Sequence, residues 1–327
     1  MLDGFTHFTK LAAETIKLVD YNYKSIFVDG LNEGDSDGSQ LNPFASVSEA
    51  VTAMTADTSA SGFVLYLSHG AYTESSVVAF PDKPIVIYGN GATVTASAGV
   101  TFANENVVIR DLTIAGNATF SNADVGRVVL SDSAITGTTT ANGRTDAIFC
   151  GIKDVVVAST AQVLLFGCTK TGVVTSEGIY FEYVCNTNTG KATPLITSTA
   201  GYVVVNGSIL MNTSTGGAIS CDNGADGTIA ANYVTNSIIV VASGSAIAAD
   251  DAYLVFNKNM VTGTVSGTNI IGAADVIGVG TMVVLGSDAT GDMYYRAATT
   301  GLLTRIPKGT DGQVLKMVSG VPAWATA

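Results

Sequence analysis

Residues 107–114 read VVIRDLTI, and residues 128–135 repeat the pattern as VVLSDSAI. Each stretch is an apolar strand, a small polar corner and a second apolar strand. The pattern returns at 204–210, VVNGSIL, and at 255–261, VFNKNMV. Asn, Asp and Gly tolerate the left-handed backbone that a tight corner needs. The variable intervals between fixed corners, roughly 16 to 30 residues, are typical of a coil whose loops differ in length. The sequence therefore predicts a parallel β-helix.

The predicted coil extends over 63–280. Short apolar runs recur through it, at Phe63–Leu67, Ile85–Tyr88, Val107–Ile109, Val128–Leu130, Val163–Phe166, Tyr202–Val205 and Tyr253–Phe256. Side chains that stack between coils at roughly 4.8 Å favour small or aliphatic residues inside. We expect Asn186, Asn206, Asp222 and Asn257 to form part of one corner ladder. A β-sandwich is the alternative, but it favours tighter hairpins and cleaner alternation.

Composition supports stacked β-structure and excludes several functions. Charged residues are 13% and hydrophobic residues 47% of the chain, which argues against disorder. The net charge of −12 disfavours nucleic acid and anionic membranes as partners. The sequence contains no run of 18 apolar residues, so no membrane span is predicted. The start, MLDGF, lacks the pattern of a signal peptide, so we expect synthesis in a cytoplasm. We expect no cofactor.

The four cysteines, Cys150, Cys168, Cys185 and Cys221, lie at intervals that suggest one structural period and its double. Their spacing does not fit a zinc site. We interpret them as buried small hydrophobes stacked on successive coils, with disulfides or a metal as the alternatives.

Two units are expected before the coil. Phe5, Phe8, Ile16 and Val19 follow a helical period, so residues 1–24 are predicted to form an attachment helix. Its apolar face could instead pack on this chain's own body. Residues 25–62 are predicted to form a loop and a capping helix. Ser46 and Glu49 make a capping box for a helix from about Val47 to Thr55.

The loop before that helix alternates acidic residues, Glu33, Asp35 and Asp37, ahead of Gly38, as a calcium loop does. Its closing position is Phe44, which has no carboxylate. Turns held by Asx hydrogen bonds explain the loop better. We therefore predict no metal site.

Residues 281–327 are predicted to be a run of short strands cut by turns. Residues 305–324 read RIPKGTDGQVLKMVSGVPAW. One short hairpin is marginal in water, so these strands need a partner surface. Val314, Leu315, Met317 and Trp324 are the expected packing residues.

Two features resemble known virion proteins. The 305–324 segment resembles the C-terminal segments of bacteriophage tail fibres. The order of strand, Asp-Gly-rich loop, Asn-Pro-Phe and short helix in 25–62 resembles the start of phage proteins with a pectin-lyase-like β-helix. The resemblance implies a right-handed parallel β-helix with an N-terminal helical segment and a C-terminal β-rich trimeric tip. It implies a short homotrimeric tail fibre or spike on the virion. Its N-terminus would bind other virion proteins and its tip the host surface. A capsid-attached head fibre or decoration protein is the first alternative.

The second alternative is a depolymerase of host polysaccharide, because pectin-lyase-like coils often carry such enzymes. Glycoside hydrolysis needs two carboxylates across the bond. The catalytic candidate is Glu182, which lies among Tyr180, Phe181 and Tyr183. The ordinary interpretation of Glu182 is a solvated strand residue. The coil has few aromatic residues on which a sugar could stack, and the chain has only two histidines. Both observations argue against an enzyme.

Overall fold

The computed structural model describes residues 23–103, 106–121, 127–222, 231–271, 292–296 and 303–326. The chain divides into two compact units, Met1–Asp275 and Val276–Ala327. The predicted attachment helix, with Phe5, Phe8, Ile16 and Val19, lies outside the described residues.

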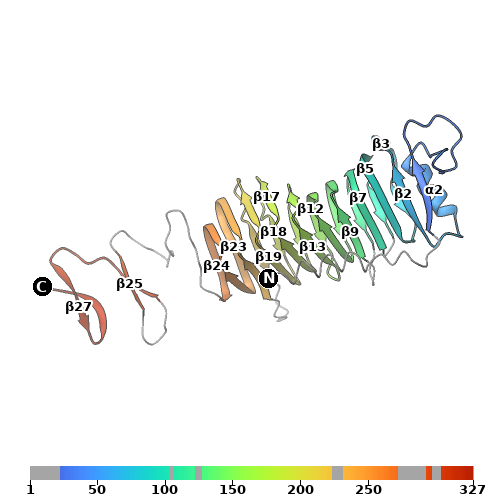
Figure 1. Ribbon diagram of the computed structural model, residues 1–327. Coiled ribbons are helices and arrows are strands. Elements are labelled where there is room, and N and C mark those ends of the chain that lie inside the picture. Colours follow the sequence, from blue (N-terminus) through green and yellow to red (C-terminus); the bar gives the residue numbers. More distant parts are fainter. Residues whose placement is uncertain are drawn as a thin grey trace. The chain divides into compact units, whose positions relative to one another are not determined.

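The first unit is a coil in which each strand pairs in parallel with a strand of the next turn (Figure 1). Three sheets run along it. We call the first sheet A; its strands pair in the order β1 (Tyr23–Val28), β2 (Gly62–Leu67), β5 (Ile85–Ala96), β7 (Asn106–Ala115), β9 (Arg127–Ser131), β11 (Arg144–Ile148), β13 (Gln162–Phe166), β16 (Ile179–Tyr183), β19 (Tyr202–Asn206), β22 (Ala231–Thr235), β23 (Ile238–Asn257) and β24 (Met260–Ile271).

Sheets B and C complete each turn and share the longer strands. Sheet B adds β3 (Ala71–Glu74), β10 (Ala134–Ala141), β12 (Gly151–Val157), β14 (Thr169–Lys170), β17 (Asn186–Thr189) and β20 (Ile209–Asn212). Sheet C adds β4 (Val78–Phe80), β6 (Val100–Phe102), β8 (Ala118–Phe120), β15 (Val174–Ser176), β18 (Ile196–Ser198) and β21 (Ile219–Asp222). The predicted parallel β-helix is confirmed. The β-sandwich is excluded, because the pairings described for this unit are parallel.

The corners between sheets A and B use left-handed backbone, as predicted. Positive φ falls on Asp111 and Asp132 in the two repeats, and on Gly207 and Lys258 in the later ones. Phe149 and Val184 also adopt it, although bulky side chains disfavour this region. Each of these corners is therefore set by its place in the coil as well as by its residue type.

The residue after the corner carries a hydrogen-bond ladder between turns. The backbone N–H of Cys185 donates to Ser208 Oγ, that of Ser208 to Ser237 Oγ, and that of Ser237 to Asn259 Oδ1, at 3.2, 3.2 and 2.9 Å. The predicted ladder of Asn186, Asn206, Asp222 and Asn257 is wrong as a single column. Asn206 and Asn257 share a column of sheet A, whereas Asn186 begins a strand of sheet B and Asp222 ends one of sheet C.

Three cysteines occupy this same corner position on successive turns. The thiols of Cys150, Cys168 and Cys185 are free and buried, as predicted. Hydrogen bonding between neighbouring thiols lowers the pKa of Cys150 and raises the pKa of Cys168 to about 12. Cys221 does not continue the column, since it lies in β21, and burial raises its pKa to about 12. The interval between Cys185 and Cys221 is therefore not two periods of one column, and Ser208 takes the next rung.

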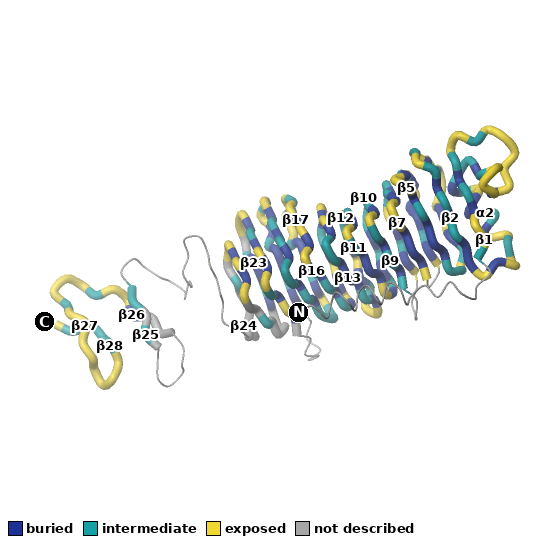
Figure 2. The backbone as a smooth tube through the Cα atoms, in the orientation of Figure 1, coloured by how far each residue is buried: buried dark blue, intermediate teal, exposed yellow. Residues whose placement is uncertain are grey.

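The interior is a set of columns, which appear as dark blue bands along the coil in Figure 2. In sheet A, Ile87, Ile109 and Leu130 lie in register and are buried. In sheet C the rings of Phe80, Phe102 and Phe120 stack, with centroids 4.7 and 5.2 Å apart. The coil thus buries like side chains on like.

A helix covers the first turn of the coil. It is α2 (Val47–Ala56), where the sequence predicts it, and Ser46 Oγ accepts from the backbone N–H of Glu49 at 3.2 Å. Val47, Ala50, Val51 and Met54 are its buried side chains. The buried carboxylate of Glu74 accepts from the backbone N–H of Val47 at 2.9 Å, which suits the positive end of a helix. No described helix is long and apolar enough to cross a membrane.

The acidic loop before α2 is built from Asx turns, as predicted. The side chains of Asp29, Asn32 and Asp37 each accept from the backbone N–H two residues on, at 3.0, 3.2 and 2.8 Å. Within the described ranges, no cluster of three potential metal ligands is present.

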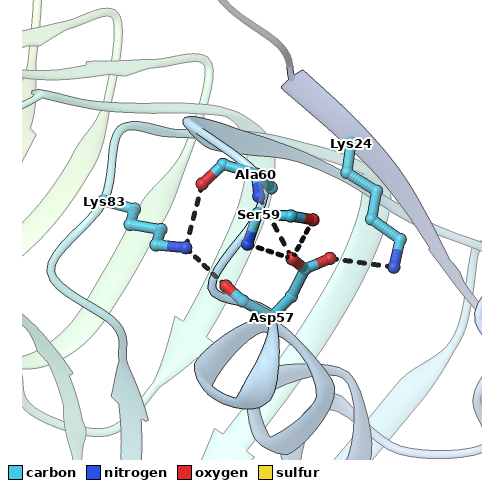
Figure 3. A network of polar contacts seen from close by, with 5 residues as sticks. All are labelled: Lys24, Asp57, Ser59, Ala60 and Lys83. Carbon is cyan, nitrogen blue, oxygen red and sulfur yellow. Dashed lines mark hydrogen bonds and ion pairs between the residues drawn. The ribbon is translucent and has the colours of Figure 1, made fainter.

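A polar network fixes the end of α2 (Figure 3). Asp57 accepts from Lys24 Nζ at 3.0 Å and from Ser59 Oγ at 2.7 Å. Lys83 Nζ donates to the carbonyl of Ala60 at 2.9 Å and also to that of Asp57. The helix is thereby tied to β1 and to the loop after β4.

We expect this network to make stability sensitive to acid. Hydrogen bonds from Ser59 and Lys24 hold the pKa of Asp57 well below its ordinary value of 3.8. A depressed pKa adds stability above the unfolded-state value, and that stability is lost as pH falls below 3.8. In acid titration followed by circular dichroism, Asp57→Asn should show a weaker loss of stability below this pH than the parent chain. Asp35→Asn, which changes an exposed residue of the loop before α2, is the control, and equal acid profiles for Asp57→Asn and the parent would contradict the prediction.

Candidate functional site: the C-terminal hairpins and a buried polar cluster

Two antiparallel hairpins form the described part of the second unit. The first pairs β25 (Met293–Arg296) with β26 (Leu303–Ile306), and the second pairs β27 (Gln313–Val318) with β28 (Val321–Thr326). The predicted run of short strands cut by turns is confirmed here. Ser319 and Gly320 join β27 to β28, and both have positive φ. A two-residue turn of this kind matches the twist of the flanking strands.

Trp324 ties the second hairpin to the segment after β26. Its indole Nε1–H donates to the carbonyl of Pro307 at 2.6 Å, and it lies opposite Leu315 in the register. A Cβ at Gly309 would lie 2.7 Å from the indole ring. Gly309 is therefore needed where the chain passes the ring.

Gly309→Ala is expected to displace the indole ring, because the added methyl group occupies its position. Trp324 is the only tryptophan, so fluorescence excited where tyrosine does not absorb reports on this contact. We expect quenching by acrylamide to increase in Gly309→Ala. Gly34→Ala, the same substitution in the loop before α2, serves as control, because its added Cβ meets no atom closer than 3.6 Å. Unchanged quenching in Gly309→Ala would show that the ring does not rest on this segment.

The second hairpin exposes apolar side chains on both faces. Val314, Leu315, Met317 and Val318 on β27 are 39%, 43%, 68% and 47% exposed. Neighbouring strand residues point to opposite faces. Figure 2 shows β27 almost wholly in yellow. Within one chain the predicted packing residues Val314, Leu315 and Met317 thus lack cover among the described residues, while Trp324 is half-buried.

A second cluster lies inside the coil. Lys170 ends β14, and Tyr180 and Glu182 lie in β16 on the following turn. All three side chains are fully buried. Lys170 Nζ donates to Glu182 Oε2 and, at 3.3 Å, to the Tyr180 hydroxyl, which donates to the same Oε2 at 2.6 Å.

The solvated position expected for Glu182 is wrong. Glu182 lies in register between Leu165 and Val205, an inward column of sheet A. Its carboxylate is therefore enclosed by the coil and does not face a ligand on the surface. The inward residues were expected to be small or aliphatic, and this cluster departs from that pattern. The sequence could have indicated that Glu182 points inward only through an alignment of the turns. In that alignment Glu182 takes the position that the apolar residues Leu165 and Val205 take in the neighbouring turns.

Sheet A carries a further buried carboxylate. Asp146 pairs with Arg127 and with Arg144 Nε, the latter at 3.7 Å. Two of the basic residues of the early turns are therefore engaged by one acid.

No family model matches this chain, and no curated protein matches it either. Among solved structures, the chain is similar to a pectin methylesterase from Aspergillus niger, at 13% identity over 78% of this chain and 94% of that one, with a TM-score of 0.42. It is also similar to a pectin methylesterase in complex with a hexasaccharide, at 14% identity over 88% of this chain and 86% of that one, with a TM-score of 0.33. At these identities the likeness concerns the chain path alone.

Proposed function

We propose that this protein is a bacteriophage structural protein, a short trimeric tail fibre or spike that attaches the virion to the host surface. The resemblance of residues 305–324 to fibre tips is one support. The parallel coil with a covered first turn is the second, because it makes a stiff rod. In this proposal the protein is made in the host cytoplasm and resides on the virion.

The observation that carries the proposal is the apolar exposure of β27. A two-stranded ribbon with apolar side chains exposed on both faces is marginal alone in water. Association with copies of itself covers both faces and the strand edges at once. The occupant we propose for this surface is therefore the same hairpin of two further copies.

Attachment to the particle is assigned to residues 1–24 and contact with a host glycan to the tip. A head fibre or decoration protein shares this architecture and differs in the virion protein that the N-terminus binds. Labelling the protein on intact particles distinguishes tail from head.

A depolymerase is the second alternative. Glu182, the catalytic candidate for this activity, is fully buried, so its carboxylate cannot contact a polysaccharide on the surface. Incubating the purified protein with host capsule or lipopolysaccharide tests this alternative, and release of short saccharides would favour it over a purely structural role.

The mass of the assembly in solution tests the fibre. We expect a trimer of about 100 kDa from the chain mass of 33.3 kDa. Leu315→Asp/Met317→Asp places charges on one face of β27 and is expected to shift the protein to monomer. The matched control is Thr310→Asp/Gln313→Asp, which adds the same charge at the base of the hairpin. A parent chain that is monomeric in solution would contradict the proposal of a trimeric fibre.

A further inference from the structure

The cluster of Lys170, Tyr180 and Glu182 joins two sheets and two turns of the coil. Lys170 comes from sheet B, in register between Ile152 and Thr187. Glu182 comes from sheet A of the next turn, between Leu165 and Val205. The stacking of the turns therefore places the Lys170 amine next to the Glu182 carboxyl group, which lies on the following turn.

The pair is shielded from water. Lys170, Tyr180 and Glu182 have exposed fractions of 1%, 0% and 0%. Glu182 Oε1 has no hydrogen-bond partner among the described residues. A buried carboxylate with an unpaired oxygen is costly, and so is a buried ammonium. A proton transfer from Nζ to the carboxylate would remove both charges and would place an amine beside a carboxylic acid.

A neutral amine beside a carboxylic acid is the reactive pair for amide formation. We propose that Lys170 and Glu182 condense to an intramolecular isopeptide bond, which makes this cluster a self-modification site. The inference rests on the coil and is independent of the virion role.

The reaction balances without a further reactant. Lys170 Nζ attacks Glu182 Cδ, and a C–N bond forms. The C–O bond to Oε2 then breaks, and Oε2 leaves as water with the proton passed on by the Tyr180 hydroxyl. Tyr180 takes back a proton from the nitrogen, so the products are one amide and one water.

Tyr180 is placed for this proton transfer, since its hydroxyl lies 2.6 Å from Oε2 and 3.3 Å from Nζ. Burial and the neighbouring Glu182 raise the pKa of Tyr180 well above its ordinary value, so the hydroxyl is protonated and can pass a proton on as it receives another. It touches the reacting atoms and is a catalytic residue of the proposed step.

The coil holds the Lys170 amine and the Glu182 carboxyl group in contact, which favours their reaction. Effective molarities for well-oriented intramolecular reactions reach about 10⁵–10⁸ M. The amide also removes the buried charges, which are otherwise a standing cost to the folded state. Once formed, the bond closes a loop from 170 to 182 and links sheet B of one turn to sheet A of the next.

Mass spectrometry of the denatured full-length protein tests the bond. We expect the chain to be one water lighter than its sequence requires. Trypsin should fail to cut after Lys170 and should release one peptide spanning 154–191, lighter by one water. Fragment ions should place the link at Glu182 and not at Glu177. A chain of full mass that yields separate peptides 154–170 and 171–191 would overturn the proposal.

Three variants separate the chemistry from folding. Lys170→Arg should have its full calculated mass, because guanidinium does not condense here. Lys191→Arg, a lysine of the same peptide, should still lack one water. Tyr180→Phe keeps the ring and should retain mostly unlinked chain after expression. Complete linkage in Tyr180→Phe would remove Tyr180 from the proposed step, and loss of water from Lys170→Arg would overturn the proposal.

Discussion

Lys170→Met is expected to lower the free energy of unfolding by about 3–5 kcal/mol, because it leaves the buried Glu182 carboxyl group without the partner that Lys170 provides. The Glu182 side chain is fully buried in its inward column between Leu165 and Val205. The loss should appear as a lower midpoint of urea unfolding, followed by circular dichroism. The absence of the proposed bond in this variant adds to the same effect.

A double variant separates the unpaired charge from the loss of packing. Lys170→Met/Glu182→Leu replaces both partners by apolar groups of similar size, and such replacements are often neutral or stabilising. It should be clearly more stable than Lys170→Met, which also lacks the proposed bond, since only the Tyr180 hydroxyl then has no partner. A double variant as unstable as Lys170→Met would show that the charge is not the cause.

Phe102→Ala is expected to cost about 3–5 kcal/mol, the usual range for truncating a buried phenylalanine. The ring is fully buried and lies between Phe80 and Phe120, so its removal leaves a cavity with a ring on each side. The coil cannot collapse into this space easily, because the backbones of neighbouring turns are held in register by sheet C. The unfolding midpoint in urea should fall accordingly.

Tyr66→Ala provides a matched control. Tyr66 also stacks between two rings, Phe27 and Tyr88, with centroids 4.9 and 5.3 Å apart, but it lies half-buried in sheet A. If burial dominates, Tyr66→Ala should cost clearly less than Phe102→Ala. Equal losses would instead assign the stability to ring stacking.

The sequence predicted what depends on local residue type. The Asp corners at Asp111 and Asp132 and the N-cap at Ser46 lie where the pattern indicated, because turn and cap preferences act over a few residues. The predicted capping box is only half formed, because the Glu49 carboxylate accepts from the backbone N–H of Ala45 and not of Ser46. The runs Phe63–Leu67 and Val163–Phe166 both lie in strands for the same reason.

The buried cluster could not be predicted in this way, because it depends on register between turns. Phe181 and Glu182 alternate among aromatic neighbours, so either face of β16 was a candidate for the interior. Only the pairing of Leu165 with Glu182 decides it. Lys170 reaches the cluster because β14 and β16 belong to different sheets of neighbouring turns. The cover that we propose for Val314 and Met317 likewise depends on contacts outside one chain, which residue type alone does not specify.

The corner ladder has a consequence for how such a rod changes in length. A backbone N–H at one corner donates to a side chain one turn further on, as Ser208 does to Ser237. Removing a residue from a loop shortens one turn but leaves the later rungs paired, because the intervals between Cys185, Ser208, Ser237 and Asn259 already differ. Removing or duplicating a whole turn would preserve the spacing of the remaining rungs. Changes in the length of the rod are therefore expected in multiples of complete turns, so that its reach varies in discrete steps.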